Sequence, residues 1–444
     1  MEFCELTATP TKRIPPLCSP DNSNPDSTSM TIQRKAWKLC YDYLQGSWKQ
    51  INPEDVVLRQ ISGGLTNLIY HVSLPKSLRP KPGEPKEALL RLYGQKYNEN
   101  DVQTSSKVLE NVIFTLLSEK NLGPKLLGVF REGRLEEFIQ ARSMTQEEVR
   151  DPYLSCLIAK KMSKIHRLNM PINKENQWLF STLHKYQDQI SSVTLDGVSQ
   201  RHYHLAEKLL SFNFPSETEW LKKFLSKFHS PIVFCHNDIQ GGNILLRRGP
   251  KFKEDEKLLL IDFEFADYNF RAFDLANHLC EYMYDYTNED YPFYYCLRKN
   301  FPTRQRQMEF FSAYLSTDET LGVSTSGSSL GLPFQDRLRE RANSAGAGPA
   351  SASPPKKNPG KRVRHLSCQQ QSEILFHEVQ AFLLAPHLLW CMWSIIQSTN
   401  TKIPFGYWSY ASDRMEDYIS HKNAILAMTD PILGIGQKRT LHEN

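Results

Sequence analysis

The spacing of apolar residues divides the chain into a strand-rich first part and a helix-rich second part. A helix is predicted over Ile32 to Trp48 because apolar residues recur there at helical spacing. Ser105 to Lys120 has a second apolar helical face. Alternating or short apolar runs predict strands at Val56 to Ile61, Leu68 to Leu74, Ala88 to Tyr93, Leu126 to Phe130 and Arg134 to Ile139.

The pattern after residue 143 is mainly helical. Helices are expected at Leu157 to Leu168, Trp178 to Tyr186, Trp220 to Phe228, Phe273 to Tyr286, Thr303 to Leu315, Ser372 to Gln397 and Tyr407 to Ile419. The expected organisation is α+β, with a disordered leader at 1–30, a small antiparallel-sheet lobe at 31–142 and a larger helical lobe at 143–444. Residues 316–367 are rich in Ser, Gly, Pro and Lys, so we expect a disordered insertion there.

Charge and cysteine content narrow the class of protein. The formal net charge is +5, but residues 317–366 hold eight Lys or Arg against four Asp or Glu. The remainder is near neutral, so no nucleic-acid partner is expected. Nine cysteines without a C-x-x-C motif, no secretory signal and no apolar run of membrane-spanning length predict a reduced, soluble protein of the cytosol.

Two short apolar runs, Ile232 to Cys235 and Leu258 to Ile261, are each followed by polar residues. The first leads into H-N-D-I-Q-G-G-N, which contains Asp238 and Asn243, and the second leads into D-F-E-F, which begins at Asp262. A carboxylate can accept a hydroxyl proton, and a second carboxylate with an amide can hold magnesium against nucleotide phosphates. The pattern therefore favours phosphoryl transfer.

The first lobe contains weaker signals for phosphate binding. The turn S-G-G-L-T-N, from Ser62 to Asn67, could present backbone N–H groups to phosphate, although a plain hairpin explains it equally well. Arg91, in A-L-L-R-L-Y-G, could reach a phosphate, and Glu110 could orient it by an ion pair. For both residues a surface position is an equal alternative.

These motifs together resemble the choline/ethanolamine kinase family, within the protein-kinase-like and aminoglycoside-phosphotransferase-like superfamily. The residues are H-N-D-I-Q-G-G-N-I-L-L, D-F-E-F-A-D-Y-N-F-R-A-F-D-L-A-N-H-L-C-E, S-G-G-L-T-N, L-L-R-L-Y-G, W-L-F at Trp178 and L-L-W-C-M-W-S-I-I-Q near the C-terminus. The resemblance extends from about Ala36 to Ser420, apart from the insertion. It implies a bilobal protein-kinase-like fold that phosphorylates choline to phosphocholine, the first step of the CDP-choline route to phosphatidylcholine, and also acts on ethanolamine.

The resemblance also implies roles for individual residues, with ATP and Mg²⁺ as cofactors. Asp238 would be the catalytic base, and Asn243, Asp262 and Glu264 would hold magnesium. ATP would contact Ser62, Gly63, Gly64, Leu65, Thr66, Asn67, Leu68, Arg91, Glu137, Phe138, Ile139, Gln140, Ala141, Arg142, Ser143, Gln240 and Asp262. Choline would contact Gly64, Leu65, Thr66, Asp238, Phe265, Glu281, Tyr286, Trp390, Trp393 and Tyr410. A homodimer, or a heterodimer with a paralogue, is implied as well.

Aromatic residues suit a quaternary ammonium, which has no N–H group to donate and is attracted to ring faces. Trp390 and Trp393 are three residues apart, so both indoles should share one helix face. Three positions depart from the family pattern: Phe265 stands where Tyr is common, Tyr282 where Trp is common, and Gly241 where an acid is common.

Three alternatives differ in class or substrate. One is an enzyme that acts mainly on ethanolamine, although the tryptophan pair favours choline. Another is a protein kinase, but the sequence has no G-x-G-x-x-G, V-A-I-K, D-F-G or A-P-E motif. The last is a catalytically inactive scaffold, against which the intact Asp238, Asn243 and Asp262 argue.

Overall fold

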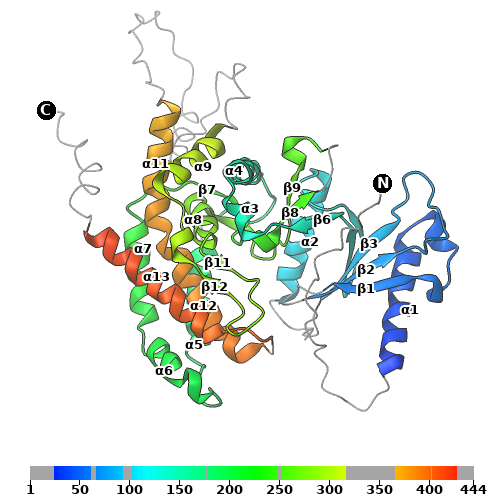
Figure 1. Cartoon of the computed structure of the whole chain (residues 1–444), viewed down its shortest axis with the longest axis horizontal. Coiled ribbons are helices and arrows are strands. Elements are labelled where there is room, and N and C mark those ends of the chain that lie inside the picture. Colours follow the sequence, from blue (N-terminus) through cyan, green and yellow to red (C-terminus); the bar gives the residue numbers. More distant parts are fainter. Residues whose placement is uncertain are drawn as a thin grey trace, which may run out of the picture.

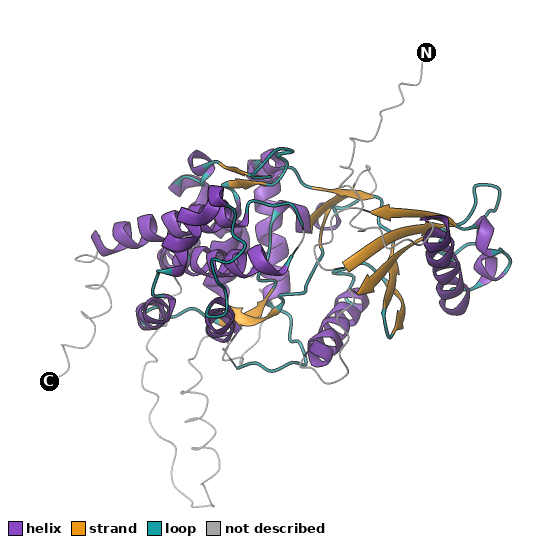
Figure 2. Ribbon diagram, turned by 90° about the horizontal axis from the view of Figure 1, so that it is seen from below, coloured by secondary structure: helices purple, strands orange, loops and turns teal. Residues whose placement is uncertain are grey.

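The computed structural model describes residues 25–61, 67–93, 103–175, 178–247, 252–316, 366–401 and 403–427. These residues form a strand-rich lobe and a larger helical lobe (Figure 1). Figure 2 shows the wide sheet in one lobe and most helices in the other. The predicted α+β, two-lobed architecture is therefore confirmed. The expected leader, apart from its last residues, and nearly all of the expected insertion lie outside the described residues.

The first lobe is built on a five-stranded antiparallel sheet in the order β1-β2-β3-β5-β4. Its strands are β1 (Val57–Ile61), β2 (Asn67–Ser73), β3 (Glu87–Tyr93), β4 (Leu126–Phe130) and β5 (Gly133–Glu137). Along β3, Leu90 and Leu92 are buried on one face, so Arg91 points to the other. Gly133 allows β5 to approach β3 closely, because a Cβ there would lie 2.0 Å from the Arg91 carbonyl oxygen.

Helices α1 (Pro25–Tyr43) and α2 (Gln103–Glu119) belong to this lobe. Cys40 and Leu44 of the α1 region join Leu90 and Leu135 in one buried cluster, which confirms the expected apolar helix face. The helix begins at Pro25, seven residues before the predicted start. Ile113 of α2 joins the larger core of the second lobe, so α2 connects the two lobes by packing.

Residues 138–140 lead from β5 into a second, three-stranded sheet. Its order is β6 (Ala141–Ser143), β8 (Ile244–Arg247) and β9 (Leu258–Leu260), all antiparallel. The strand β6 was not expected from the sequence, because three residues carry too little alternation to be recognised. Met144 N donates to the carbonyl oxygen of Gly241 at 3.2 Å, so the chain that joins the lobes lies against the loop before β8.

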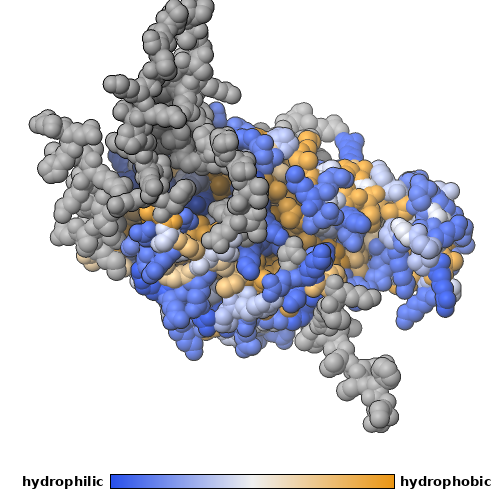
Figure 3. All heavy atoms as spheres, turned by 90° about the horizontal axis from the view of Figure 1, so that it is seen from above, coloured by the Kyte–Doolittle hydropathy of each residue, from blue (hydrophilic) through white to orange (hydrophobic). Residues whose placement is uncertain are grey.

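The second lobe is mainly helical. Its helices are α3 (Gln146–Arg150), α4 (Pro152–His166), α5 (Trp178–Ile190), α6 (Gln200–Leu210), α7 (Phe214–Leu225), α8 (Arg271–Glu281), α9 (Arg304–Ser316), α11 (Cys368–Phe382), α12 (Leu384–Asn400) and α13 (Tyr407–Ala427). Two strand pairs complete it: β7 (Ile232–Cys235) with β10 (Asp267–Phe270), and β11 (Tyr284–Asp285) with β12 (Tyr295–Cys296). On the face shown in Figure 3, hydrophobic residues gather near the middle of the molecule.

Two expected helices have different limits in the structure. The helix predicted over Phe273 to Tyr286 ends at Glu281, because the chain turns there and enters β11. The helix predicted over Ser372 to Gln397 is two helices separated at Leu383. Pro386 lies in the first turn of α12, where a missing N–H group is tolerated, and this favours a new helix start.

The segment Cys368–Asn400, which contains α11 and α12, is long and apolar enough to cross a membrane by length and composition. The prediction that no apolar run reaches membrane-spanning length was therefore wrong. Its most apolar window is 89% buried inside the protein, as is common for a core helix of a globular domain.

Candidate active site

The loop that carries Asp238 begins at the end of β7. Asp267 of β10 pairs with Cys235, the last residue of β7, so His236 is the first residue beyond the strand pair. The loop then passes through a short 3₁₀ turn at Gly241–Asn243 into β8. Strands on both sides therefore fix its two ends.

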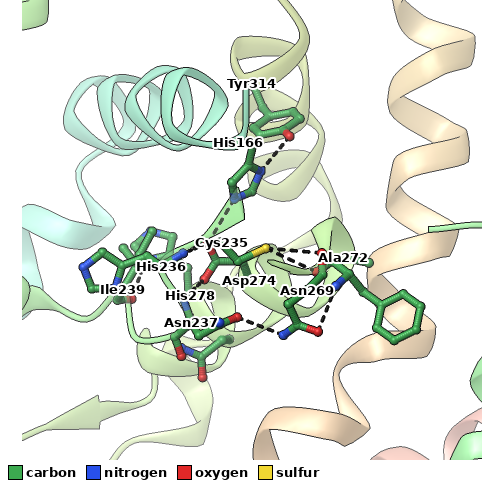
Figure 4. Close-up of polar contacts among 12 residues, drawn as sticks. His166, Cys235, His236, Asn237, Ile239, Asn269, Ala272, Asp274, His278 and Tyr314 are labelled. Atoms are coloured by element: carbon green, nitrogen blue, oxygen red, sulfur yellow. Dashed lines mark hydrogen bonds and ion pairs between the residues drawn. The ribbon is translucent and has the colours of Figure 1, made fainter. Parts of the chain in front are cut away.

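Asp274, in the first turn of α8, anchors this loop (Figure 4). Its carboxylate accepts the backbone N–H groups of His236 at 3.0 Å and Asn237 at 2.8 Å. His166 Nε2 lies 3.0 Å from the same carboxylate. Burial would raise the pKa of Asp274, but these contacts hold it below its usual value. The acid was not singled out from the sequence, yet it positions the start of the loop.

Two buried histidines support the same loop. His236 Nε2 donates to the Ile261 carbonyl oxygen at 2.9 Å, so its Nδ1 accepts the Asp238 N–H group at 3.3 Å. His236 therefore stabilises the loop through both of its ring nitrogens. His278 Nδ1 donates to the Ile239 carbonyl oxygen at 3.0 Å, and burial lowers the pKa of His278 to about 4. Both rings therefore act as neutral donors.

Asn237 and Asp262 adopt left-handed backbone angles, with φ of 67° and 65°. Non-glycine residues in this region are uncommon and cost on the order of 1 kcal/mol or more. Asn237 is held there by its side chain, which donates to Phe265 O at 2.9 Å and accepts from Asn269 at 2.8 Å. Two of the four non-glycine residues with positive φ in the described part of the chain are therefore in these two polar loops.

Asp238 and Asn243 are in direct contact. Asn243 Nδ2 donates to Asp238 Oδ2 at 2.8 Å and to its backbone oxygen at 2.9 Å. Desolvation raises the pKa of Asp238 well above its usual value, and the nearby charges of Glu281, Asp262 and Glu264 raise it further. Three acidic side chains from two other chain segments are therefore close enough to Asp238 to affect its pKa.

The predicted metal ligands Asp262 and Glu264 are close enough to Asp238 to raise its pKa, but the three acids do not form a group with ligand atoms within 4.8 Å of one another. β9 ends at Leu260 and Asp262 has a left-handed backbone, so strand alternation does not place Asp262 and Glu264 on one face. Both acids nevertheless raise the pKa of Asp238. Among the described residues, one group of three or more His, Cys, Asp or Glu side chains has its ligand atoms within 4.8 Å of one another. It consists of His166, Cys235 and Asp274.

We interpret that set as structural, because its atoms already have partners. Cys235 Sγ lies 3.6 Å from the Asn269 carbonyl oxygen, and Asp274 accepts three donors. Burial raises the pKa of the Cys235 thiol well above its usual value. Cys235 and Cys280 are both buried and have free thiols.

Arg91 has a different partner from the one predicted. Its Nε donates to Glu136 Oε1 at 2.8 Å, and the same oxygen accepts Arg134 Nε at 2.8 Å. Glu110 contacts Arg134 instead of Arg91. Burial would lower the pKa of Arg91, but Glu136 and, more weakly, Asp262 raise it. Arg91 is therefore a fixed, charged group on the side of the sheet that faces Asp262.

The other predicted ATP contacts have mixed positions. Residues 62–66 lie outside the described residues, so the predicted phosphate turn stays a prediction, while Asn67 and Leu68 begin β2. Glu137 to Ser143 connect β5 to β6 between the two sheets. Gln240 Oε1 accepts the Gly242 N–H group at 2.9 Å, so this side chain stabilises the loop.

Aromatic residues predicted to bind choline come together from four segments. We call Phe265, Tyr286, Trp390, Trp393 and Tyr410 the aromatic cluster. The ring centres of Trp390 and Phe265 are 5.6 Å apart, and those of Trp390 and Trp393 are 5.5 Å apart, both edge to face. Tyr286 OH lies 3.0 Å from Tyr410 OH. The expected shared face of the two tryptophans is confirmed.

Further contacts connect the aromatic cluster to α8 and to the segment after α12. Trp390 Nε1 donates to Asn277 Oδ1 of α8 at 2.7 Å, and Asn277 Nδ2 in turn donates to the Asn237 carbonyl oxygen at 3.4 Å. Phe405 and Tyr407, which sequence reasoning missed, connect Trp393 to Tyr410 through rings 5.0 to 6.2 Å apart. Their position just after α12 was the only available signal.

Glu281 is buried and already has partners. Its Oε2 accepts the hydroxyl of Tyr286 at 2.9 Å, and its Oε1 contacts Nη2 of Arg414. Arg414, on α13, was not predicted and is fully buried. Glu281, which was expected to contact choline, is therefore already paired with a cation of the protein, Arg414.

The three departures from the family pattern have local explanations. Phe265 keeps an aromatic ring against Trp390. Tyr282 donates to, or accepts from, Ser155 at 2.8 Å and lines a separate cleft of about 210 Å³ beside α4 and α9. A Cβ at Gly241 would lie 3.1 Å from the Met144 carbonyl oxygen, so an acid there would need this contact to loosen.

Comparisons with known proteins agree with this arrangement. The sequence matches the family model described as choline/ethanolamine kinase over residues 58–419. Choline kinase alpha of Mus musculus is 39% identical over 414 residues, which cover 88% of this chain and 81% of the mouse protein. Choline/ethanolamine kinase of Homo sapiens is 37% identical over 413 residues, with 93% and 92% covered.

A solved structure supports the fold. The crystal structure of choline kinase from Cryptosporidium parvum has a TM-score of 0.64 at 24% identity, covering 89% of this chain and 96% of that one. Kinases of this family use ATP and a divalent metal ion. The matched length and the identity to curated relatives establish that the chain belongs to the choline/ethanolamine kinase family.

Proposed function

We propose that the protein transfers the terminal phosphoryl group of ATP to the hydroxyl of choline, and secondarily to that of ethanolamine. The product, phosphocholine, begins the CDP-choline route to phosphatidylcholine. The carrying observation is the buried loop after β7, in which Asn243 Nδ2 donates to Asp238 Oδ2 at 2.8 Å. Burial raises the pKa of Asp238, and the nearby acids Glu281, Asp262 and Glu264 raise it further. We place Asp238 between the proposed amine site, at Glu281, and the proposed metal site, at Asp262 and Glu264.

Asp238 is the proposed base. A carboxylate at a fixed loop position can orient a substrate hydroxyl and accept its proton as the phosphoryl group is transferred. Asn243 donates to one of its oxygens, which leaves the other oxygen for the substrate. Asp274, His236 and His278 fix the loop, and this limits the movement of the base.

The proposed metal is Mg²⁺, held by Asn243, Asp262 and Glu264. Magnesium prefers hard oxygen ligands, and these residues offer two carboxylates and an amide oxygen. Because Asn243 uses its Nδ2 toward Asp238, its Oδ1 suits a ligand. When bound, the ion offsets negative charge on the phosphates. Arg91, fixed by Glu136, adds a second positive charge toward the same phosphates.

The aromatic cluster is the proposed ammonium site. A cation over an aromatic face gains roughly 0.5–2 kcal/mol per ring, and a quaternary ammonium needs no hydrogen-bond acceptor. Several rings around one carboxylate therefore favour choline. The alternative of a mainly ethanolamine-phosphorylating enzyme would rely on free acceptors, and both oxygens of Glu281 are already in use.

The remaining proposals concern the state of the protein in the cell. We place it in the cytosol, as a homodimer or a heterodimer with a paralogue. These assignments rest on family resemblance. The intact Asp238, Asn243 and Asp262 argue against the inactive-scaffold alternative, because a scaffold does not require a buried acid paired with an amide, as Asp238 and Asn243 are.

Trp393→Leu tests the ammonium site. We expect KM for choline to rise about 2- to 30-fold, the equivalent of 0.5–2 kcal/mol for one lost aromatic face. KM for ATP and kcat should change less than twofold, and Trp393→Phe should keep most of the affinity. Steady-state kinetics with each substrate varied gives these values.

Trp220→Leu is a matched control, because Trp220 stacks on Phe224 within α7, outside the aromatic cluster. It should leave KM for choline unchanged. If folded Trp393→Leu has an unchanged KM for choline, the aromatic cluster is not the ammonium site.

A further inference from the structure

Arg414 lies behind the aromatic cluster and has no role in the proposed function so far. Its Nη2 donates to Tyr410 OH at 2.5 Å and contacts Glu281 Oε1. Its guanidinium carbon is 3.9 Å from the centre of the Tyr284 ring and 5.0 Å from that of Tyr410. One side chain therefore connects the carboxylate to two aromatic rings.

This buried cation is not explained by stability alone. Arg414 is 0% exposed, and its Nε and Nη1 have no hydrogen-bond partner among the described residues. A buried ion pair is generally no more stabilising than a pair of apolar residues, and unpaired buried donors add a cost. Arg414 is therefore unfavourable for stability, yet it contacts Glu281 and Tyr410 of the proposed amine site directly. This combination favours a role in substrate binding.

The pair formed by Glu281 and Arg414 has no net charge. A substrate cation near Glu281 also meets the repulsion of Arg414, so the attraction from the carboxylate is reduced. The attraction from the ring faces is not reduced, because it comes from the rings themselves. Because Arg414 neutralises Glu281, the aromatic rings contribute a larger share of the attraction for the substrate cation.

The two amines respond differently to this balance. A primary ammonium carries three N–H donors and is strongly hydrated, so it needs free acceptors in the site. Glu281 offers few, because Arg414 occupies Oε1 and Tyr286 donates to Oε2. A quaternary ammonium has no N–H donors and loses nothing when these oxygens are occupied.

The geometry points to Arg414 as a positioning residue that makes the amine site selective for quaternary ammonium, by neutralising Glu281 and fixing Tyr410. This inference rests on the proposed function, because it takes the aromatic cluster as the amine site. It goes beyond the proposed function, because it makes the selectivity of the amine site depend on Arg414, which is buried and already paired with Glu281.

The test uses three variants of the full chain with choline and ethanolamine as substrates. Glu281→Gln leaves Arg414 unbalanced and should lower kcat/KM for both amines about 100-fold, because an uncompensated like charge faces the substrate. Arg414→Gln leaves Glu281 unbalanced and should lower the choline-to-ethanolamine ratio of kcat/KM about tenfold, since ethanolamine gains an ionised acceptor. The double variant should return the ratio to within about threefold of wild type, because the site is again neutral.

Two more variants separate this role from a structural one. Arg414→Lys keeps the charge and should keep the ratio. Arg298→Gln removes another arginine that pairs with α13, through Asp417, and should not change the ratio. KM for ATP should stay the same in all five variants.

The outcomes are distinct. If Arg414→Gln folds and both amines lose activity in the same proportion, Arg414 is structural and the inference is overturned. If Arg414→Gln does not fold, the double variant is compared with Glu281→Gln, and failure to recover KM for choline overturns it instead. If neither Glu281→Gln nor Arg414→Gln affects KM for either amine, the assignment of the amine site itself is wrong.

Discussion

Asp238→Asn is expected to lower kcat for choline at least 1,000-fold, within the range of about 10²–10⁴ for loss of a general base and its positioning. The amide is nearly the same size as the acid but cannot accept the hydroxyl proton. Asn243 can still donate to the side-chain oxygen, as it does to Asp238 Oδ2. The loop should therefore keep its conformation. Initial rates at saturating ATP and choline give kcat, and titration with nucleotide gives the ATP affinity.

The variant should fold and bind nucleotide with affinity close to wild type. Asp188→Asn is a suitable control, because Asp188 is an exposed acid on α5 and should have no effect. If Asp238→Asn keeps more than a tenth of kcat, Asp238 is not the base. If it loses cooperative unfolding, the acid is mainly structural.

Asp274→Ala is expected to lower the free energy of unfolding by roughly 3–5 kcal/mol, because it removes one partner of a buried hydrogen-bonded cluster. The N–H groups of His236 and Asn237 and the ring of His166 lose their acceptor. The catalytic loop should loosen, and kcat should fall about 100-fold, since a misplacement of about 1 Å can cost that much. Urea unfolding and steady-state kinetics measure the two effects.

Amide hydrogen exchange shows whether the effect is local. Peptides covering residues 233–240 should exchange faster in Asp274→Ala than in wild type, more so than peptides from β2 and β3. Asp274→Asn keeps one acceptor oxygen and should fall between the two. A loss of stability with unchanged exchange in this loop and unchanged kcat would show that Asp274 does not position it.

Much of the fold could be predicted because strongly periodic segments depend on local sequence. The five strands of the first lobe and the face formed by Cys40 and Leu44 were recognised in this way. The contact between Asp238 and Asn243 was also accessible, because only four loop residues separate them. Short strands such as β6 and the end of α8 were missed, since pairing with distant segments decides them.

Partner choice among buried charges could not be predicted. In the sheet, Arg91 pairs across from Arg134, and Glu136 follows two residues later on the same face, so one carboxylate serves both arginines. That arrangement depends on the register between β3 and β5. Asp274 and Arg414 were missed because a charged residue in a helix normally faces water, and no local pattern marks these two as buried.

We propose that this chain phosphorylates amino alcohols and prefers choline. The most direct measurement compares initial rates of phosphoryl transfer from labelled ATP to choline and to ethanolamine, with Mg²⁺ and the purified protein. We expect transfer to both, with higher kcat/KM for choline, and none after removal of the divalent ion by a chelator. Absence of transfer to either amine, or a clear preference for ethanolamine, would contradict it.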